Sequence, residues 1–460
     1  MINSTLRLVV IISLHLVLLF FTRFTLWPEM VVYPYLLNNG FYLYKDIINP
    51  YLPSFIFLLS LFSKIFGFSP LPYQILTWAI IITTDIIIYF IVKRISNKEL
   101  NALAATVFFA LFSTPLGING LWFDLLQTPL IILSVYFASI YLKTKQRENL
   151  FKSLIFLTLA FLIKQQAIIF AFSLSLFLFA KIGTKLIKDL QKLKILILLI
   201  VSLAILHLII FYLQKNLADF LIWTIYFPFF KASTMQGYVQ IPSLRQASML
   251  IALVAFFAPI LGLKPIRLFI FCAVALFAFA YPRFDYFHLI PSLSLFAISL
   301  SFNLRSFKKL NPILAIISLS ALSFLTLFTI RYYLNNWNRE IRFFEADVYA
   351  EAATIKSYIG LSKSIYVQNG PDQLFPIAGF LPIKPWADEF PWYLEFNDLQ
   401  DEIVQSLKEN QPKFIIYKPY EHGEEFQIGS YKPSKVTDYI DKNYENYTKV
   451  SDTLWLKILK

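Results

Sequence analysis

Charged side chains are scarce in this 460-residue sequence. Asp, Glu, Lys and Arg together make up 15% of it, whereas hydrophobic residues make up 58%. So few polar side chains do not cover a water-facing surface, and lipid must therefore be the solvent for most of the chain. This composition excludes a cytosolic enzyme. Cysteine is scarcer still, since Cys272 is the single cysteine of the sequence. A single cysteine excludes an intramolecular disulfide.

The usual signatures of nucleotide and metal sites are also missing from the sequence. It has no P-loop, no Gly-rich dinucleotide fingerprint and no Cys/His cluster with metal-ligand spacing, and it holds only four His. We therefore predict no cofactor, while a divalent metal is neither indicated nor excluded. The net charge of +13 does not indicate nucleic acid, because residues 1–330 carry +17 and residues 331–460 carry −4. That asymmetry reflects membrane topology.

Eleven apolar runs have lengths near the one needed to cross the hydrocarbon layer of a bilayer. We therefore predict a mainly α-helical, polytopic membrane bundle of about eleven transmembrane helices over residues 1–330. The first run is interpreted as an uncleaved span because no small-residue cleavage site follows it. The runs lie at about 5–22, 73–92, 102–118, 125–142, 153–163, 167–180, 195–213, 248–263, 267–281, 289–303 and 312–330.

Basic residues set the predicted orientation, since Lys and Arg favour cytoplasmic loops. Eighteen of them share one side of the predicted membrane, which we take as cytoplasmic together with the N-terminus. We therefore predict an integral protein of the plasma membrane. An odd number of spans then places residues 331–460 on its extracytoplasmic side. The eighteen are Arg7, Lys93, Arg94, Lys98, Lys143, Lys145, Arg147, Lys152, Lys181, Lys185, Lys188, Lys192, Lys194, Lys264, Arg267, Arg305, Lys308 and Lys309.

One apolar segment, residues 53–68, does not fit this scheme as a span. Pro53, Lys64 and a length of sixteen residues leave it at the lower limit for crossing, and a further span would invert every later loop. We favour a helix lying along the outer interface, although a transmembrane helix stays open. The first outer loop then runs over residues 23–72.

The chain changes character beyond Arg331, where charge density rises and the long apolar runs stop. Short β-rich runs alternate there with helical patterns, which indicates a small water-soluble α/β domain at residues 331–460. The predicted strands lie at 364–368, 413–418 and 453–459, and the predicted helices at about 397–409 and 434–445.

Three carboxylates on the predicted outer side are candidates for acid–base chemistry. Glu29 follows Trp27-Pro28 where the first span emerges, at the bilayer surface, and it is suited to act as a general base. The structural alternative is an acid at the N-terminus of a helix over 29–38. Asp124 is the only charge in a tight loop, with helix capping as its alternative. Asp46 has pairing with the adjacent Lys45 as its alternative.

Basic groups at membrane depth are the second kind of candidate, because a lone ammonium among apolar side chains needs an anion. Lys164 lies between two apolar runs, and Arg283, Asp285 and His288 lie where the ninth span meets the outside. A guanidinium there suits a phosphate because it is planar and permanently charged. Its alternative is an interfacial anchor formed with the surrounding aromatic residues.

The order and sidedness of these motifs resemble membrane glycosyltransferases of the GT-C superfamily. The resemblance is to the branch of the protein O-mannosyltransferases and the aminoarabinose lipid A transferases (glycosyltransferase family 39-like), and it covers essentially the whole chain. The resembling parts are Leu26-Trp27-Pro28-Glu29, the stretch from Asn39 to Asp46 with Pro50 and Pro53, Asp124, Phe161-Leu162-Ile163-Lys164-Gln165, and the stretch from Arg283 to His288 with Pro291.

The resemblance implies inverting transfer of a sugar from a polyprenyl-phosphate donor to a lipid, glycan or protein acceptor on the extracytoplasmic face. It implies a catalytic first outer loop, with Glu29, Asp124 and Asp46 as the catalytic acids. Lys164, Arg283 and His288 would bind the donor phosphate, and Asp285, Gln165 and Tyr44 would line the substrate pocket. Many relatives carry two adjacent acids where this chain has Glu29-Met30, and this departure disfavours a doubled-carboxylate or metal-binding version of the site.

Two other classes of protein remain as alternatives. The first is a transporter or flippase for a lipid-linked or polar solute, whose charges would lie near the bilayer midplane in related halves of the chain. The second is a non-catalytic receptor or assembly protein whose outer domain binds the partner. The acids gather on one predicted side, and the sequence has no detectable internal repeat, so both alternatives rank below the enzyme.

Overall fold

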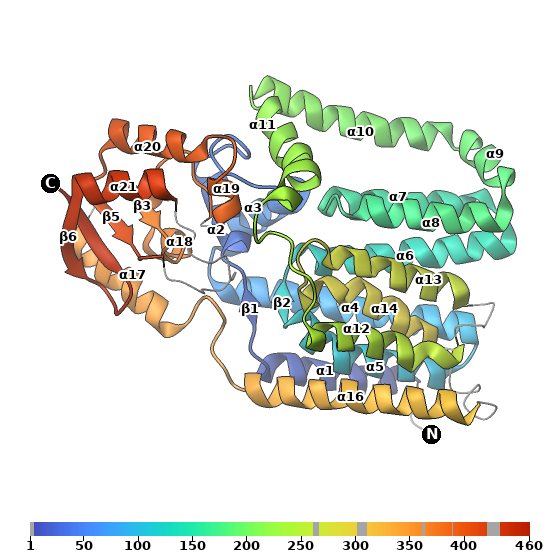
Figure 1. Cartoon of the computed structure of the whole chain (residues 1–460). Coiled ribbons are helices and arrows are strands. Elements are labelled where there is room, and N and C mark those ends of the chain that lie inside the picture. Colours follow the sequence, from blue (N-terminus) through green and yellow to red (C-terminus); the bar gives the residue numbers. More distant parts are fainter. Residues whose placement is uncertain (1–3, 261–265, 301–310, 361–363, 389, 421–432) are drawn as a thin grey trace. The chain divides into compact units, whose positions relative to one another are not determined.

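The computed structural model describes residues 4–260, 266–300, 311–360, 364–388, 390–420 and 433–460 (Figure 1). The chain forms two compact units, and each unit draws on three stretches of sequence. Unit 1 comprises residues 1–25, 74–206 and 240–339, and unit 2 comprises residues 26–73, 207–239 and 340–460. The segments 26–73 and 207–239 therefore belong to the same unit as the C-terminal region. The division into domains at residue 330 stays a prediction.

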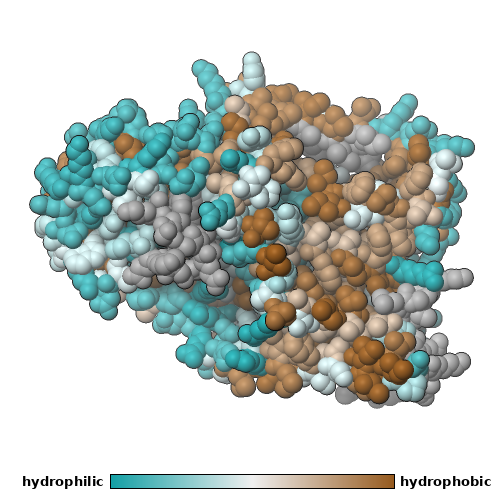
Figure 2. All heavy atoms as spheres, viewed as in Figure 1, coloured by the Kyte–Doolittle hydropathy of each residue, from teal (hydrophilic) through white to brown (hydrophobic). Residues whose placement is uncertain are grey.

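Unit 1 is built almost entirely from helices whose bounds follow the predicted apolar runs. Figure 2 shows mainly hydrophobic side chains on the visible surface of these helices. The elements are α1 (Ser4–Phe21), α4 (Pro70–Ser96), α5 (Glu99–Gly117), β2 (Gly120–Leu121), α6 (Phe123–Thr144), α7 (Arg147–Ile163), α8 (Ala167–Ile182), α9 (Thr184–Lys192), α10 (Lys194–Leu213), α12 (Leu244–Phe257), η3 (Ala258–Ile260), α13 (Arg267–Ala275), η5 (Leu276–Ala280), η6 (Tyr286–Leu289), α14 (Ile290–Ser299) and α16 (Pro312–Asn336). Three elements contain a point of the sequence at which the chain passes from one unit to the other. They are the short strand β1 (Thr25–Leu26), α4 and α10.

Five helices in the described ranges are long and apolar enough to cross a bilayer: α1, α4, α5, α6 and α16. A sixth span results if α8 and α9, which meet at a bend of 116°, count together. The shorter apolar helices include α12 and the segments 267–280 and 286–299. The mainly helical bundle is confirmed, whereas the number of eleven spans stays a prediction. The ends of the predicted runs 248–263 and 289–303 lie outside the described residues.

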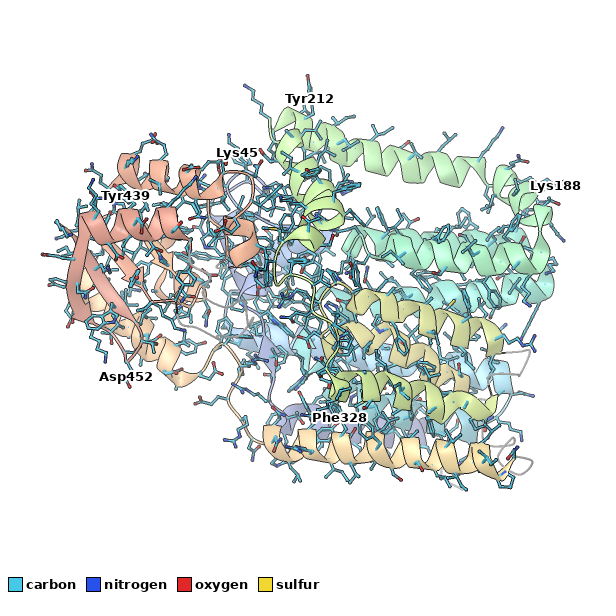
Figure 3. The ribbon with its side chains drawn as sticks, viewed as in Figure 1. Lys45, Lys188, Tyr212, Phe328, Tyr439 and Asp452 are labelled. Carbon is cyan, nitrogen blue, oxygen red and sulfur yellow. The ribbon has the colours of Figure 1, made fainter. Side chains whose placement is uncertain are left out.

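The core of unit 1 is rich in phenylalanine, and its rings connect helices that are far apart in sequence. Phe108 of α5 stacks on Phe256 of α12, with ring centroids 5.5 Å apart. Phe257, the next residue of α12, stacks on Phe296 of α14 at 4.7 Å. Such pairs add to the packing energy of the buried area. Lys188 on α9, by contrast, is exposed at the surface (Figure 3).

Asn119 connects three segments of unit 1 at the end of α5. Its amide nitrogen donates to the carbonyl oxygens of Leu19 at 2.9 Å and Thr22 at 3.0 Å, and its amide oxygen accepts from the indole of Trp78 at 3.1 Å. The side chain is buried. Its hydrogen bonds satisfy carbonyl groups at the end of α1, where no intrahelical donor is left.

Replacing this amide leaves buried acceptors without donors, and each such group costs roughly 1 to 3 kcal/mol. We expect Asn119→Ala to lower the free energy of unfolding by about 2 to 4 kcal/mol. The measurement is the thermal unfolding midpoint of the detergent-purified protein. Gln191→Ala, on an exposed position of α9, is the control. Equal midpoints for the two variants would contradict the structural role of Asn119.

Unit 2 contains the mixed sheet and the helices around it. Its elements are α2 (Glu29–Asn38), α3 (Ser54–Phe66), α11 (Leu217–Leu221), the π-helical segment η1 (Ile222–Lys231), η2 (Ala232–Thr234), α17 (Ala346–Ile359), β3 (Ser364–Gln368), α18 (Leu374–Ala378), β4 (Leu381–Pro382), α19 (Pro391–Leu394), α20 (Leu399–Asn410), β5 (Phe414–Tyr417), α21 (Ser434–Asn443), β6 (Tyr444–Lys449) and β7 (Trp455–Leu459). The three predicted strands and both predicted helices near the C-terminus are confirmed. The helix expected over 29–38 is also present.

The sheet of unit 2 has the strand order β4-β3-β5-β7-β6. β3 pairs in parallel with β4 and β5, whereas β7 pairs antiparallel with β5 and β6. The short strand β4 is therefore an edge strand. The parallel half of the sheet is formed by strands whose residues are almost all buried, such as β3 after its first residue, and long buried apolar runs are typical of parallel strands.

Helix α3 corresponds to the segment that did not fit the predicted spans. Its 13 residues extend about 20 Å, which is less than the roughly 30 Å of the hydrocarbon core. One face, with Phe55 and Leu59, is buried, while Leu58, Leu61 and Ile65 are more than half exposed. An apolar face that unit 2 leaves uncovered favours the predicted interfacial position.

Candidate functional site

The carboxylate of Asp124 forms the centre of a buried ionic cluster in unit 1. Asp124 lies in the first turn of α6, after the N-cap residue Trp122. Its Oδ2 accepts a hydrogen bond from Nζ of Lys164 at 2.8 Å, and Nδ1 of His288 lies 3.0 Å from the same oxygen. Sequence analysis picked out all three residues separately, and the structure brings them together. The side chain of Asp124 therefore pairs with the ammonium of Lys164 and contacts the imidazole of His288, and it is not the cap of its helix.

Local sequence explains why Lys164 reaches Asp124. Helix α7 ends at Ile163, and Lys164 has an extended backbone before α8 begins at Ala167. The side-chain amide of Gln127, one turn after Asp124, donates to the carbonyl oxygens of Ala160 at 2.7 Å and Lys164 at 3.0 Å. These bonds fix the end of α7 against α6. The ammonium group is thereby directed to the first turn of α6.

The cluster is almost completely removed from solvent. Asp124 is 0% exposed and Lys164 is 2% exposed, and 12% of the His288 side chain is accessible. The second carboxylate oxygen of Asp124, Oδ1, has no hydrogen-bond partner among the described residues. Charges buried in this way are tolerated only when they are paired, because desolvation costs several kcal/mol per ion. The arrangement keeps a buried ammonium and an imidazole beside each other on one acid.

Breaking this pairing leaves an uncompensated buried charge, so we expect Asp124→Asn to cost about 3 to 5 kcal/mol of unfolding free energy. Lys164→Met should cost a similar amount. The double variant should be more stable than the sum of the two single effects by at least about 1 kcal/mol. Thermal unfolding of the purified proteins measures this cycle, and Glu148→Gln, which breaks an exposed pair with Lys152, is the control. Strict additivity would contradict the coupling.

The remaining predicted residues of unit 1 lie along the chain close to the cluster. Arg283 is partly exposed and lies before the turn η6, which carries His288. Asp285 is the N-cap of that turn, and its Oδ1 accepts from the backbone N–H of Tyr286 at 2.7 Å. Gln165 is buried next to Lys164. The contact of Asp285 is therefore structural, whereas the roles of Arg283 and Gln165 stay predictions.

Glu29 of unit 2 belongs to a different polar neighbourhood. It is the first residue of α2 and is partly exposed. One turn later, the hydroxyl of Tyr33 donates to Oδ2 of Asp388 at 3.3 Å. Burial, together with the negative charges of Asp388 and Glu29, raises the pKa of Tyr33 well above its ordinary value, so this phenol stays protonated. The neighbourhood of Glu29 thus contains two carboxylates, those of Glu29 and Asp388, near the hydroxyl of Tyr33.

Asp388 and Tyr33 were not among the residues that sequence analysis selected. Asp388 lies in the water-soluble part of the chain, where acids are common and single out no site. Tyr33 is one of 26 tyrosines. Neither residue carries a local signal, because their proximity depends on contacts between segments about 350 positions apart. The only sequence clue is the acid Glu29 itself, which lies one helical turn from Tyr33.

Asp46 and Tyr44 act as anchors of the first predicted outer loop. Oδ2 of Asp46 accepts from Nζ of Lys384 at 2.8 Å and from the backbone N–H of Tyr42 at 3.0 Å. The pairing of Asp46 with its neighbour Lys45, the expected alternative, is not what the structure shows. The hydroxyl of Tyr44 donates to the carbonyl oxygen of Tyr51 at 2.9 Å. Both side chains therefore hold the loop together, and a chemical role for either stays a prediction.

The described residues contain no group of three or more His, Cys, Asp or Glu side chains arranged to hold a metal ion. The acidic and basic groups form two separate clusters instead. In unit 1 the acid is outnumbered by an ammonium and an imidazole, which suits an anionic ligand. In unit 2 two carboxylates lie near a protonated phenol, which suits a hydroxyl or amine ligand that gives up a proton.

Comparisons with known proteins give one matching family model and several similar solved structures. Residues 49–211, which include Asp124 and Lys164, match the family model described as dolichyl-phosphate-mannose-protein mannosyltransferase. Among solved structures, ArnT from Cupriavidus metallidurans bound to undecaprenyl phosphate is similar, with a TM-score of 0.57 and 11% identity. That match covers 98% of this chain and 97% of ArnT. No curated protein matches the sequence.

Two further solved structures show the same kind of likeness. ArnT from Cupriavidus metallidurans in the apo state has a TM-score of 0.53 and 12% identity, with 98% of this chain and 97% of that chain covered. The Archaeoglobus fulgidus oligosaccharyltransferase in complex with zinc and sulfate has 11% identity over 93% of this chain and 68% of that chain, but its TM-score of 0.47 is too low to support the fold. The chain therefore has the fold of the two ArnT structures.

Proposed function

We propose that this protein transfers a sugar from a polyprenyl-phosphate-linked donor to a lipid, glycan or protein acceptor on the extracytoplasmic face of the plasma membrane, with inversion at the anomeric carbon. The observation that carries the proposal is the buried cluster of Lys164 and His288 on Asp124. It occurs in a chain with the fold of a membrane glycosyltransferase, and the matching family model spans two of its three residues. A lipid-linked donor needs no nucleotide site.

The cationic groups have the chemistry that the leaving phosphate requires. As the bond between the anomeric carbon and the phosphate oxygen breaks, negative charge grows on the phosphate. The buried ammonium of Lys164 stabilises that charge. The imidazole of His288, which lies beside it on Asp124, donates a hydrogen bond to the same phosphate. Electrostatic stabilisation is strongest where water is excluded, because the local dielectric is low. Arg283 adds a planar, bidentate donor for the same phosphate.

Glu29 has the role of the base. Its carboxylate accepts the proton of the acceptor hydroxyl or amine while the acceptor atom attacks the anomeric carbon opposite the phosphate. Asp388 and Tyr33 provide a second acceptor and a donor that orient the attacking group. Asp124 is assigned a positioning role, because its Oδ2 is occupied by Lys164 and His288. Asp46 positions the first outer loop through Lys384.

The experiment is transfer from a labelled polyprenyl-phosphate sugar by the purified protein, with wild type and Glu29→Gln compared. Removing a general base lowers turnover by roughly 10² to 10⁴-fold. We expect kcat to fall in this range, while the Kd for the donor is unchanged because the proposed role of Glu29 is toward the acceptor.

The matched control is Glu445→Gln, an exposed position on β6, which should turn over like wild type. Glu29→Asp keeps a carboxylate and should retain part of the activity. Full turnover by Glu29→Gln would remove the base assignment. Absence of donor binding in wild type would refute the transferase itself, and solute exchange without sugar transfer would favour a transporter.

A further inference from the structure

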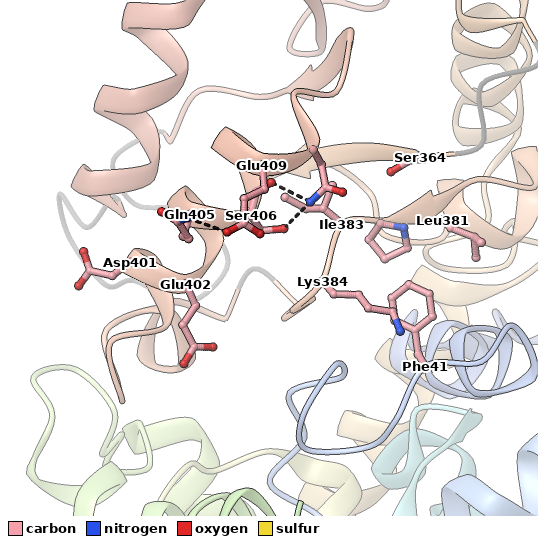
Figure 4. A pocket seen from close by; sticks show the side chains of 12 residues that line it. Phe41, Ser364, Leu381, Ile383, Lys384, Asp401, Glu402, Gln405, Ser406 and Glu409 are labelled. Atoms are coloured by element: carbon pink, nitrogen blue, oxygen red, sulfur yellow. Dashed lines mark hydrogen bonds between the residues drawn. The ribbon is translucent and has the colours of Figure 1, made fainter. Parts of the chain in front are cut away.

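Unit 2 contains a groove of about 780 Å³ (Figure 4). Glu29, Tyr33 and Asp388 are not among the residues that line it. One wall is a single face of α20, and the other is the edge strand β4 with the two residues after it. The volume is within the range of pockets that bind small molecules, roughly 300 to 1,000 Å³. Phe41 and Lys384 lie at one end, and Glu402 projects from the wall opposite Lys384.

The helix wall is a row of polar side chains. Asp401, Glu402, Gln405 and Glu409 follow the spacing that places residues on one face of a helix. Hydrogen bonds within this wall restrict the side chains. The amide of Gln405 donates to Glu409 at 2.7 Å, and the amide of Asn410 donates to the carbonyl oxygen of Ser406 at 2.8 Å and to its hydroxyl at 3.1 Å. Amides, carboxylates and hydroxyls together offer both donors and acceptors.

The opposite wall is apolar except for the cation of Lys384 and the hydroxyl of Ser364. Leu381, Pro382 and Ile383 form the apolar part. The ammonium of Lys384 is held at 2.8 Å from Asp46 and lies 4.4 Å from the centroid of the Phe41 ring. A groove with one apolar wall and one wall of hydrogen-bonding groups matches the shape of a sugar, which has an apolar C–H face and hydroxyl groups at its edge.

The charges of the groove select the kind of sugar. Burial raises the pKa of the Glu402 carboxyl, and the negative charges of Asp219 and Asp398 raise it further. Asp401 is neutralised by Lys435. The negative charges of Asp219 and Asp398 beside Glu402, and the carboxylate of Glu409 on the same wall, would repel an anionic ligand, whereas a neutral ligand would meet no such repulsion.

A peptide is a poorer fit to the same groove. An extended peptide would add to the sheet through the exposed backbone of β4, which is the edge strand. That strand has only two residues, and Pro382 has no N–H to donate. The backbone therefore offers too few hydrogen bonds for strand addition, and the side chains are left as the recognition elements.

We propose that this groove binds a neutral, hydroxyl-rich saccharide, and that this saccharide is the glycan part of the acceptor. The second statement rests on the proposed glycosyltransferase function, and the first does not. Glu402, Gln405 and Asn410 hydrogen-bond the hydroxyl groups, and Leu381 with Ile383 contacts the apolar face of the ring. The proposal assigns the acceptor class of the enzyme to a site on α20 and β4.

Binding is tested with the full-length protein in nanodiscs by saturation-transfer NMR, with maltotriose and N,N′,N″-triacetylchitotriose as neutral probes. Trigalacturonic acid is the anionic probe, and a Lys-rich nonapeptide is the peptide probe. We expect transfer to at least one neutral probe, with an effect at least 5-fold weaker in the double variant Glu402→Ala/Gln405→Ala. The control is Lys408→Ala, an exposed residue of α20 that does not line the groove, and it should behave like wild type.

Each outcome decides the proposal. Absence of transfer to both neutral probes, equal transfer in the double variant, or preference for the anionic or peptide probe would overturn it. Its failure is separable from failure of the proposed function. If the enzyme transfers sugar and the groove variants keep the wild-type KM for a glycan acceptor, only the acceptor site is wrong. If saccharide binds at the groove but no lipid-linked donor binds, the transferase function is wrong instead.

Discussion

The need to pair every charge that is buried among apolar helices is the constraint on which unit 1 depends. Lys164 interrupts an apolar stretch, so its ammonium must find an anion, and Asp124 at the start of α6 provides it. His288 on η6 reaches the same carboxylate. One acid thereby connects α6, the break between α7 and α8, and the turn before α14. The helices can change sequence over most of their apolar surface, but this connection fixes which ends meet.

The same constraint operates a second time in unit 1, and there it is structural. Asp85 of α4 accepts from His15 of α1 at 2.6 Å, and both side chains are fully buried. The second ring nitrogen of His15 lies 3.3 Å from the hydroxyl of Ser113 on α5. Three helices are joined in this way, and no part of the pair is accessible. His288, whose side chain retains some exposure, differs on this point, which is why the Asp124 cluster and not the Asp85 pair is the functional candidate.

Sequence patterns predicted what depends on local composition. The apolar runs gave helices with bounds close to those observed, such as 125–142 for α6, and charges at membrane depth drew attention to Asp124, Lys164 and His288 before any contact was known. Pairing was not predictable, because it depends on where distant helix ends meet. The assembly of unit 2 from three stretches was missed for the same reason. In that unit acids are common in the sequence, so Asp388 carried no signal until Tyr33 was seen beside it.

The sugar transfer proposed above needs carboxylates in two states, one that pairs with a cation and one that accepts a proton. A carboxylate whose Oδ2 already accepts from an ammonium and lies beside an imidazole, as in Asp124, is a weaker base, because the ammonium stabilises its negative charge. A carboxylate that takes a proton from an acceptor must keep a lone pair for that proton. Asp124 pairs with the buried ammonium of Lys164, so this pairing needs no other acid. In the proposed reaction the proton transfer is assigned to Glu29, partly exposed at the start of α2, so the two tasks fall to different residues.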